Sequence, residues 1–206
     1  MSSHPALVRE GGNEASPAEL EAECPKLQMT LATLDRVRDA GEKALVFTEY
    51  KRMQEILMRC IHHRYGFWAG RINGDVDGNT RQFVVDDFNN SERFDVLVLS
   101  PTAGGVGLNI TGANHVIHYT RLWNPAKEMQ ATARAHRIKQ TKTVTVYYPV
   151  VEHPDFETIE VRLDKLLERK SKLAQDVIRP SKGLDITLEE LEDLIGEPVA
   201  DGKTND

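Results

Sequence analysis

Short apolar runs that alternate with helical patterns constrain the fold of this chain most strongly. The runs have the length and composition of buried strands, and they lie at Ala44–Phe47, Phe67–Ile72, Val96–Leu99, Val116–Tyr119 and Val144–Tyr147. Between them, apolar residues recur with a helical period. This alternation predicts a layered α/β fold with a mainly parallel central sheet flanked by helices. In such sheets ligands bind at the carboxyl ends of the strands, so the loops after Phe47, Leu99 and Tyr119 are candidate binding loops.

The composition divides the chain into four segments. Residues 1–25 are rich in Gly, Ser, Glu and Ala, and we expect a flexible lead-in. Residues 26–152 contain the strand and helix patterns and predict one α/β domain. A long amphipathic helix, about Asp155 to Ile178, dominates residues 153–180, and it either packs back on the domain or forms an interface. Residues 181–206 predict an acidic tail with a short helix.

Charge is unevenly distributed along the chain. The net charge is −6, but residues 184–206 contribute −7 and residues 1–26 contribute −3, which leaves about +4 for the centre. A mildly basic centre is compatible with nucleic-acid binding, but a charge of this size does not by itself indicate such binding. Cys24 and Cys60 lie far apart without CxxC spacing, which favours a reducing cytosol over a disulfide or zinc framework. No apolar run approaches the ~20 residues of a membrane helix.

Two arginines and an amide follow a helix start signal. Asn124 can cap a helix and Pro125 can occupy its first position. If that helix continues, the spacing of Gln130, Arg134 and Arg137 places all three on one face. Such a stripe is either a solvated surface with two ordinary arginines or a site for an anion with several oxygens, such as a nucleoside triphosphate.

Two glycine-containing segments fail as nucleotide-binding motifs. The segment Gly104–Gly107 lacks the third glycine of GxGxxG, since Asn109 and Ile110 stand in that neighbourhood. Gly202–Thr204 resembles the end of a P-loop, but Gly196 stands one residue too far upstream and no strand precedes it. No acidic pair that could hold magnesium follows an apolar strand. The chain therefore offers arginines for an anion without the lysine loop and metal-binding acid that ATP hydrolysis needs.

Three consecutive segments resemble motifs of the Swi/Snf-type DNA-dependent ATPases, which belong to the superfamily-two helicases. These segments are Ser100–Thr111, Trp123–Pro125 and Gln130–Gln140. Two earlier blocks, Ala44–Glu49 and Ile72–Asp75, also resemble motifs of that family. The resemblance covers only the C-terminal RecA-like lobe, from residue 26 to residue 178. Its end resembles the brace-like helix that closes the lobe.

The resemblance implies a role for each matched position. Arg134 and Arg137 fall where the family has arginine fingers, which would stabilise charge on the transferring γ-phosphoryl group of ATP bound to the other lobe. Positions of the ATP cleft between the lobes are Gln130, Gly105, Gly107 and Asn109. Positions whose amides and hydroxyls would touch DNA phosphates are Thr48, Gly74, Ser100 and Thr102. The family commonly has arginine where Thr102 stands.

The resemblance also implies partners and a cofactor. The partners would be the N-terminal RecA-like lobe of the same parent protein and double-stranded DNA, with no membrane. ATP with Mg would be the cofactor of the complete enzyme, whereas this chain alone would bind none and would be inactive. The expected location is cytoplasmic, in a bacterial cytosol or nucleoid, or nuclear in a eukaryote.

Two other functions are compatible with parts of the pattern. The chain could be a stand-alone module that binds DNA or a protein without catalysis. It could also be a small α/β enzyme with a phosphate-bearing substrate, although the failed Rossmann and P-loop tests disfavour that hypothesis.

Overall fold

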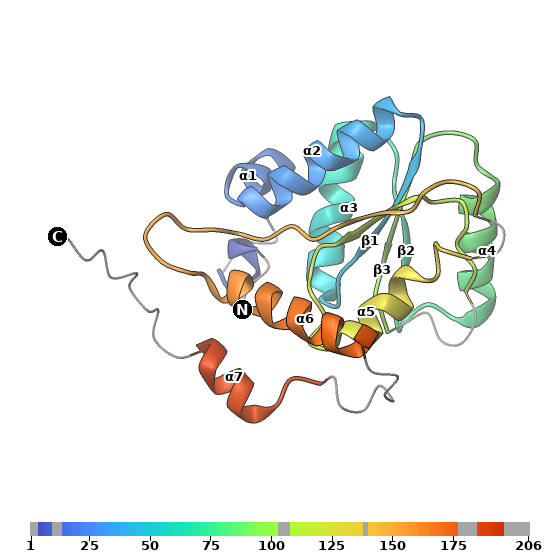
Figure 1. Ribbon diagram of the computed structural model, residues 1–206. Coiled ribbons are helices and arrows are strands. Elements are labelled where there is room, and N and C mark those ends of the chain that lie inside the picture. The colour runs from blue at the N-terminus through green and yellow to red at the C-terminus, as the bar shows by residue number, and fades with distance from the viewer. Residues whose placement is uncertain (1–3, 10–13, 103–107, 138–139, 177–184, 196–206) are drawn as a thin grey trace. The chain divides into compact units, whose positions relative to one another are not determined.

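A parallel sheet forms the centre of the fold. The computed structural model describes residues 4–9, 14–102, 108–137, 140–176 and 185–195. Within these ranges, five strands form one sheet in the order β2-β3-β1-β4-β5, and every neighbouring pair is parallel (Figure 1). The strands are β1 Lys43–Phe47, β2 Gly70–Ile72, β3 Asp95–Leu99, β4 His115–His118 and β5 Thr145–Tyr147. The predicted layered α/β architecture is confirmed.

Alternating residues of the central strands serve two separate cores. Ala44 and Val46 of β1 pack with the helices α2 (Pro25–Asp39) and α3 (Lys51–Tyr65) on one face of the sheet. Leu45 and Phe47 point the other way, into a second core with α4 (Gly78–Asn90). All five residues of β1 are buried, as expected for a central strand covered on both faces. The layers appear in Figure 1 as blue and cyan helices on one side and the green helix on the other.

The segment before α2 differs from the expected flexible lead-in. Its described residues form a short 3-10 helix, η1 (Pro5–Leu7), and an α-helix, α1 (Pro17–Ala22), that Ser16 and Glu19 cap reciprocally. Leu20 of α1 is fully buried in the core beside α3, and its carbonyl lies 2.7 Å from the Nε2 atom of the buried His4. One buried leucine and one buried histidine give no periodic signal in a polar segment, which is why the sequence pattern missed them.

Several elements differ from the predicted ranges in their ends. Asp77 accepts hydrogen bonds from the amides of Asn79 and Thr80 and thereby caps α4, which begins at Gly78. The long helix α6 begins at Ile159 rather than near residue 155, because the hydroxyl of Thr158 accepts from the amide of Val161 at its start. Strand β2 comprises only Gly70–Ile72.

A second compact unit comprises residues 121–129 and 150–206. Its described part includes α6 (Ile159–Asp176) and a short acidic helix, α7 (Leu188–Ile195). The two helices pack through a cluster of buried leucines, namely Leu163, Leu166, Leu167 and Leu194. An ion pair of 2.9 Å between Lys170 and Glu190 adds a polar contact. The predicted short helix in the acidic tail is therefore present, and it packs on α6.

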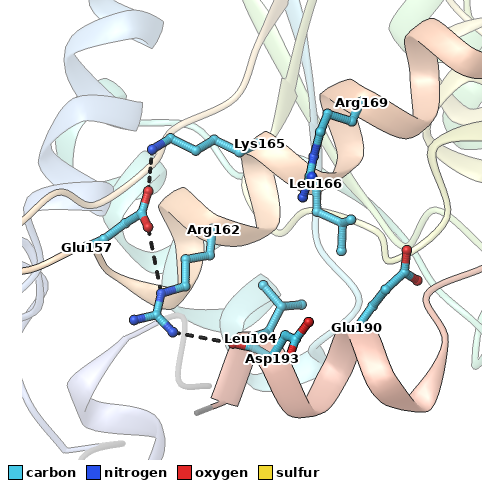
Figure 2. Close-up of a pocket in the computed structure, with 8 residues that line it drawn as sticks. All are labelled: Glu157, Arg162, Lys165, Leu166, Arg169, Glu190, Asp193 and Leu194. Atoms are coloured by element: carbon cyan, nitrogen blue, oxygen red, sulfur yellow. Dashed lines mark hydrogen bonds and ion pairs between the residues drawn. The ribbon is translucent and has the colours of Figure 1, made fainter. Parts of the chain in front are cut away.

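A pocket of about 230 Å³ lies between α6 and α7. Figure 2 shows Glu157 between Lys165 and Arg162, while Arg162 extends toward the carbonyl of Asp193 on α7. Three basic and three acidic side chains line this pocket, so it has no excess charge that would favour an anion or a cation. Among the described helices, none combines the length and apolar character needed to span a membrane.

Candidate functional site

The carboxyl ends of the central strands meet at one edge of the sheet. The backbone amides of Thr48, Ser100 and Thr120, each just beyond a strand, donate to the carbonyl of the last residue of a neighbouring strand at 3.1, 2.9 and 3.3 Å. These bonds continue the sheet pairing one or two residues beyond the ends of the strands. They bring the loops after β1, β3 and β4 side by side, at the edge where ligands bind in open α/β sheets.

Thr48, the first residue after β1, points its side chain into the fold and not into solvent. Its side chain is fully buried, and its hydroxyl lies 2.9 Å from that of Thr120. Its carbonyl accepts a hydrogen bond of 3.2 Å from Gln54, whose side-chain oxygen accepts another from Asn73. The amide, carbonyl and hydroxyl of Thr48 thus all have partners within the fold, and its predicted phosphate contact stays a prediction.

The other predicted phosphate contacts lie closer to solvent. Thr102 and Gly74 are exposed, and both follow carboxyl ends of strands. Ser100 is 7% exposed, and its hydroxyl lies 3.1 Å from the hydroxyl of Thr102. Thr102 and Gly74 are thus accessible to solvent, whereas Ser100 is buried and lies within hydrogen-bond distance of Thr102.

Helix α5 (Pro125–Thr132) begins as predicted and ends before the arginines. Asn124 accepts a hydrogen bond of 2.8 Å from the amide of Ala126, which confirms the predicted cap. At the other end, the amide of Arg134 bonds to the carbonyl of Ala131, three residues back, and this tightens and ends the helix. Gln130 is therefore helical whereas Arg134 and Arg137 are not.

The predicted stripe of Gln130, Arg134 and Arg137 on one helical face is therefore wrong. The physical reason is a tertiary hydrogen bond: the carbonyl of Arg134 accepts from the amide of Ile110 at 3.0 Å. That bond draws the chain toward the loop after β3 instead of continuing the helix. Gln130 and Arg137 are exposed, and Arg134 is buried.

Arg134 is a buried cation with incomplete hydrogen bonding. Its Nη2 atom donates a hydrogen bond of 2.8 Å to the carbonyl of Pro101, in the loop after β3. Its Nη1 atom is buried and has no hydrogen-bond partner among the described residues, and the same holds for Oδ1 of Asn109. Burial lowers the pKa of Arg134, and the positive charge of Arg137 lowers it further. A guanidinium stays ionised in proteins, so this nitrogen favours an anionic oxygen.

Asn89, at the end of α4, holds the loop that carries Asn109. Its side-chain nitrogen donates 2.9 Å to the carbonyl of Asn109, and its oxygen accepts 2.8 Å from the amide of Gly112. No pattern in the sequence predicts these contacts of Asn89. Gly105 and Gly107, which were predicted to line the cleft, lie outside the described residues.

We expect Gly112→Ala to destabilise the domain by about 1–3 kcal/mol, because overpacking at a backbone contact forces the loop to shift. A Cβ at this position would lie 2.9 Å from the Cα atom of Asn89. Thermal unfolding of the variant measures the loss. Gly78→Ala is a matched control, since a Cβ there meets nothing within 4 Å. Equal unfolding midpoints for both variants would contradict the close approach.

A buried ion pair outside the predicted set organises the start of α5. Arg121 donates to both carboxylate oxygens of Glu128, from Nε at 2.9 Å and from Nη2 at 3.0 Å, and it also pairs with Asp164 of α6. Glu128 in turn accepts 2.7 Å from the amide of Leu122. The only signal in the sequence was an arginine and a glutamate seven residues apart, a spacing that predicts no contact across a loop.

Comparison with known proteins decides the family. A model of the helicase conserved C-terminal domain matches residues 25–139. The SWI2/SNF2 ATPase core domain of Sulfolobus solfataricus superposes with a TM-score of 0.69 at 30% identity, over 93% of this chain and 37% of that one. This chain is a C-terminal lobe of the Swi/Snf-type superfamily-two helicases. The C-terminal domain of the same archaeal ATPase matches this lobe with a TM-score of 0.64, over 93% of this chain and 75% of that one.

Curated relatives of this Swi/Snf-type lobe are much longer proteins. Zorya protein ZorD of Escherichia coli O139:H28 is 42% identical over 85% of the chain, which spans 16% of ZorD. The putative ATP-dependent helicase/translocase YwqA of Bacillus subtilis is 36% identical over 93% of the chain, which spans 20% of YwqA. The chain thus corresponds to about a fifth or less of these relatives.

Two buried polar atoms, one on Arg134 and one on Asn109, define the chemistry available near this edge of the sheet. Among the described residues, no three His, Cys, Asp or Glu side chains are placed to hold a metal ion. Arg134 offers a buried cationic donor, and Asn109 offers a buried acceptor. The cationic donor fits an oxygen of a phosphate group, and the amide oxygen fits a water molecule that donates to it. The pair does not fit the carboxylate set that magnesium prefers.

Proposed function

We propose that this lobe is the C-terminal half of an ATP-driven translocase on double-stranded DNA. It would complete the ATP site of an N-terminal RecA-like lobe in the same parent protein. One observation carries the proposal: the buried guanidinium of Arg134 is held by the carbonyl of Pro101 and retains an unpartnered Nη1 among the described residues. The identity of the lobe and the relatives' ATP-dependent helicase names support it.

Each arginine would act differently in the closed enzyme. Magnesium-bound ATP on the first lobe would supply the γ-phosphoryl group that is transferred to water. Arg134, fixed at the sheet edge, would place positive charge where negative charge develops in the transition state. Arg137 is exposed and adds a second positive charge beside Arg134. Gln130 and Asn109 would border the same cleft, together with Gly105 and Gly107.

Contact with DNA would involve the backbone phosphates. Thr102 and Gly74 are exposed at the carboxyl edge of the sheet, and Ser100 is hydrogen-bonded to Thr102. Hydroxyls and backbone amides contact phosphates without reading sequence, and such binding weakens as salt rises. A structure of the archaeal SWI2/SNF2 ATPase core in complex with double-stranded DNA supports this proposal by analogy, with a TM-score of 0.66 at 28% identity.

The proposal predicts that the isolated chain has no DNA-stimulated ATP turnover, and that turnover appears when it is joined to its N-terminal lobe. The reason is that the P-loop and the metal-binding acid belong to the other lobe. Phosphate release with and without duplex DNA measures both forms. Turnover by the pure chain would contradict the proposal. If the two-lobe protein binds DNA and does not hydrolyse ATP, the lobe is a non-catalytic binding module instead.

A further inference from the structure

A buried histidine lies at the carboxyl end of β4. His118, the last residue of β4, is fully buried. Its ring stacks on Phe47 of β1 at a centroid distance of 5.2 Å and an angle of 17°, and on Tyr148 after β5 at 5.3 Å and 13°. These contacts with Phe47 of β1 and with the residue that follows β5 fix the plane of the imidazole, so that it cannot rotate freely.

This fixed ring anchors the last residue of α5. The Nε2 atom of His118 lies 2.8 Å from the hydroxyl of Thr132, which is a hydrogen bond between two side chains. Thr132 ends the helix, and its carbonyl accepts from the amide of Ala135 at 3.0 Å. Arg134 lies inside the turn that this bond closes. A shift of Thr132 would therefore move the backbone from which Arg134 extends.

We propose that His118 and Thr132 are positioning residues for Arg134. Their hydrogen bond sets where α5 ends on the sheet, and thereby sets the place and direction of the Arg134 guanidinium. Two further hydrogen bonds hold Arg134: its side chain donates to the carbonyl of Pro101, and its own carbonyl accepts from the amide of Ile110. The kinetic consequence of this inference rests on the proposed ATP-dependent function, whereas its structural consequence does not.

The chemistry of the pair favours positioning over simple core filling. An imidazole buried among apolar side chains costs free energy unless it is hydrogen-bonded. Thr132 is only half-buried, so its hydroxyl is not needed to fill a cavity. A hydrogen bond has a narrow range of length and angle, and it therefore sets a position more sharply than apolar packing does.

The structural test uses the isolated chain and does not depend on ATP. Arginine side-chain Nε–Hε signals in a ¹⁵N NMR spectrum report the environment of Arg134, assigned with Arg134→Lys. Thr132→Val, which keeps the shape and removes the hydroxyl, should shift or broaden the Arg134 signal. Thr132→Ser should restore it. Thr30→Val is the matched control, because it removes the hydrogen bond from a buried threonine hydroxyl to the carbonyl of Lys26. Both residues lie on α2, not on α5.

The kinetic test uses the two-lobe enzyme. Misplacement by about 1 Å can cost around 100-fold in rate, so Thr132→Val should lower kcat by about 10- to 100-fold while KM for ATP and DNA affinity stay unchanged. Thr132→Ser should keep most of the rate. His118→Gln should repeat the loss, and the double variant should add little to it.

The outcomes separate this inference from the proposed function. An unchanged Arg134 signal in Thr132→Val overturns the positioning role, as does a serine variant that fails like the valine variant in both tests. If Arg134→Ala itself leaves turnover unchanged, the proposed function fails, and the NMR comparison still decides whether Thr132 positions Arg134. If His118→Gln does not fold, the two Thr132 variants decide the question by themselves.

Discussion

Arg134→Ala is expected to lower DNA-stimulated ATP turnover of the two-lobe enzyme by about 10³-fold or more, which is the range for an arginine finger in phosphoryl transfer. The structure gives the reason for a large effect. Arg134 is buried, it is held by the carbonyl of Pro101, and its Nη1 is unpartnered within the described residues. A donor fixed before reaction needs no reorganisation when charge develops. Affinity for ATP should change little, because the proposed function places the phosphate-binding loop on the other lobe.

Steady-state turnover together with nucleotide binding distinguishes a rate effect from a binding effect. Arg38→Ala provides the matched control, since that arginine pairs with Asp39 on the surface of α2. Arg134→Lys should also lose most activity, because an ammonium cannot bond to Pro101 and to a phosphate oxygen with the same fork geometry. Unchanged turnover in Arg134→Ala would show that this arginine is structural and does not take part in ATP hydrolysis.

Glu128→Ala should destabilise the protein by about 3–5 kcal/mol, the usual cost of removing one partner from a buried ion pair. The side chains of Arg121 and Glu128 are only 9% and 3% exposed. Loss of the carboxylate would remove both hydrogen bonds from Arg121 to Glu128 and would leave the amide of Leu122 without its acceptor. The loss should be larger than that of any exposed ion pair in the described chain.

Chemical denaturation of the folded chain, followed by circular dichroism, measures this loss. Glu128→Gln should fall between wild type and alanine, since an amide keeps one acceptor for Leu122. The control is Lys142→Ala, which removes an ion pair to Glu42 whose lysine is 56% exposed; such surface pairs contribute about 0–1 kcal/mol. A Glu128→Ala variant as stable as the control would show that the buried pair contributes nothing net.

Period and composition were enough to predict the sheet. A run such as Ala44–Phe47 is too short for a helix and too apolar for a surface strand, so its burial in a parallel sheet follows from local sequence. The Asn124 cap and Pro125 at the first helical position were likewise readable, since capping is a local interaction. The resemblance then located the arginine segment and the loop after β3.

Long-range contacts were beyond the same reasoning. The spacing of Gln130, Arg134 and Arg137 suits a helix, and only the bond from Ile110 to the carbonyl of Arg134 shows why the helix ends at Thr132. Thr48 follows a strand at a matching motif position, yet its hydroxyl turns inward to Thr120. In both cases a partner far away in the sequence decides the conformation.

The docking of α1 has a practical meaning for anyone who exchanges lobes between related motors. Leu20 belongs to the same core as α3, and the buried His4 is hydrogen-bonded to its carbonyl, although the family match begins only at residue 25. A chimera joined at that residue would leave an apolar cavity beside α3 and would expose the thiol of Cys60, which is buried in this core. Grafts that include residues 4–24 should yield more soluble protein, so the exchangeable module is longer than its sequence signature.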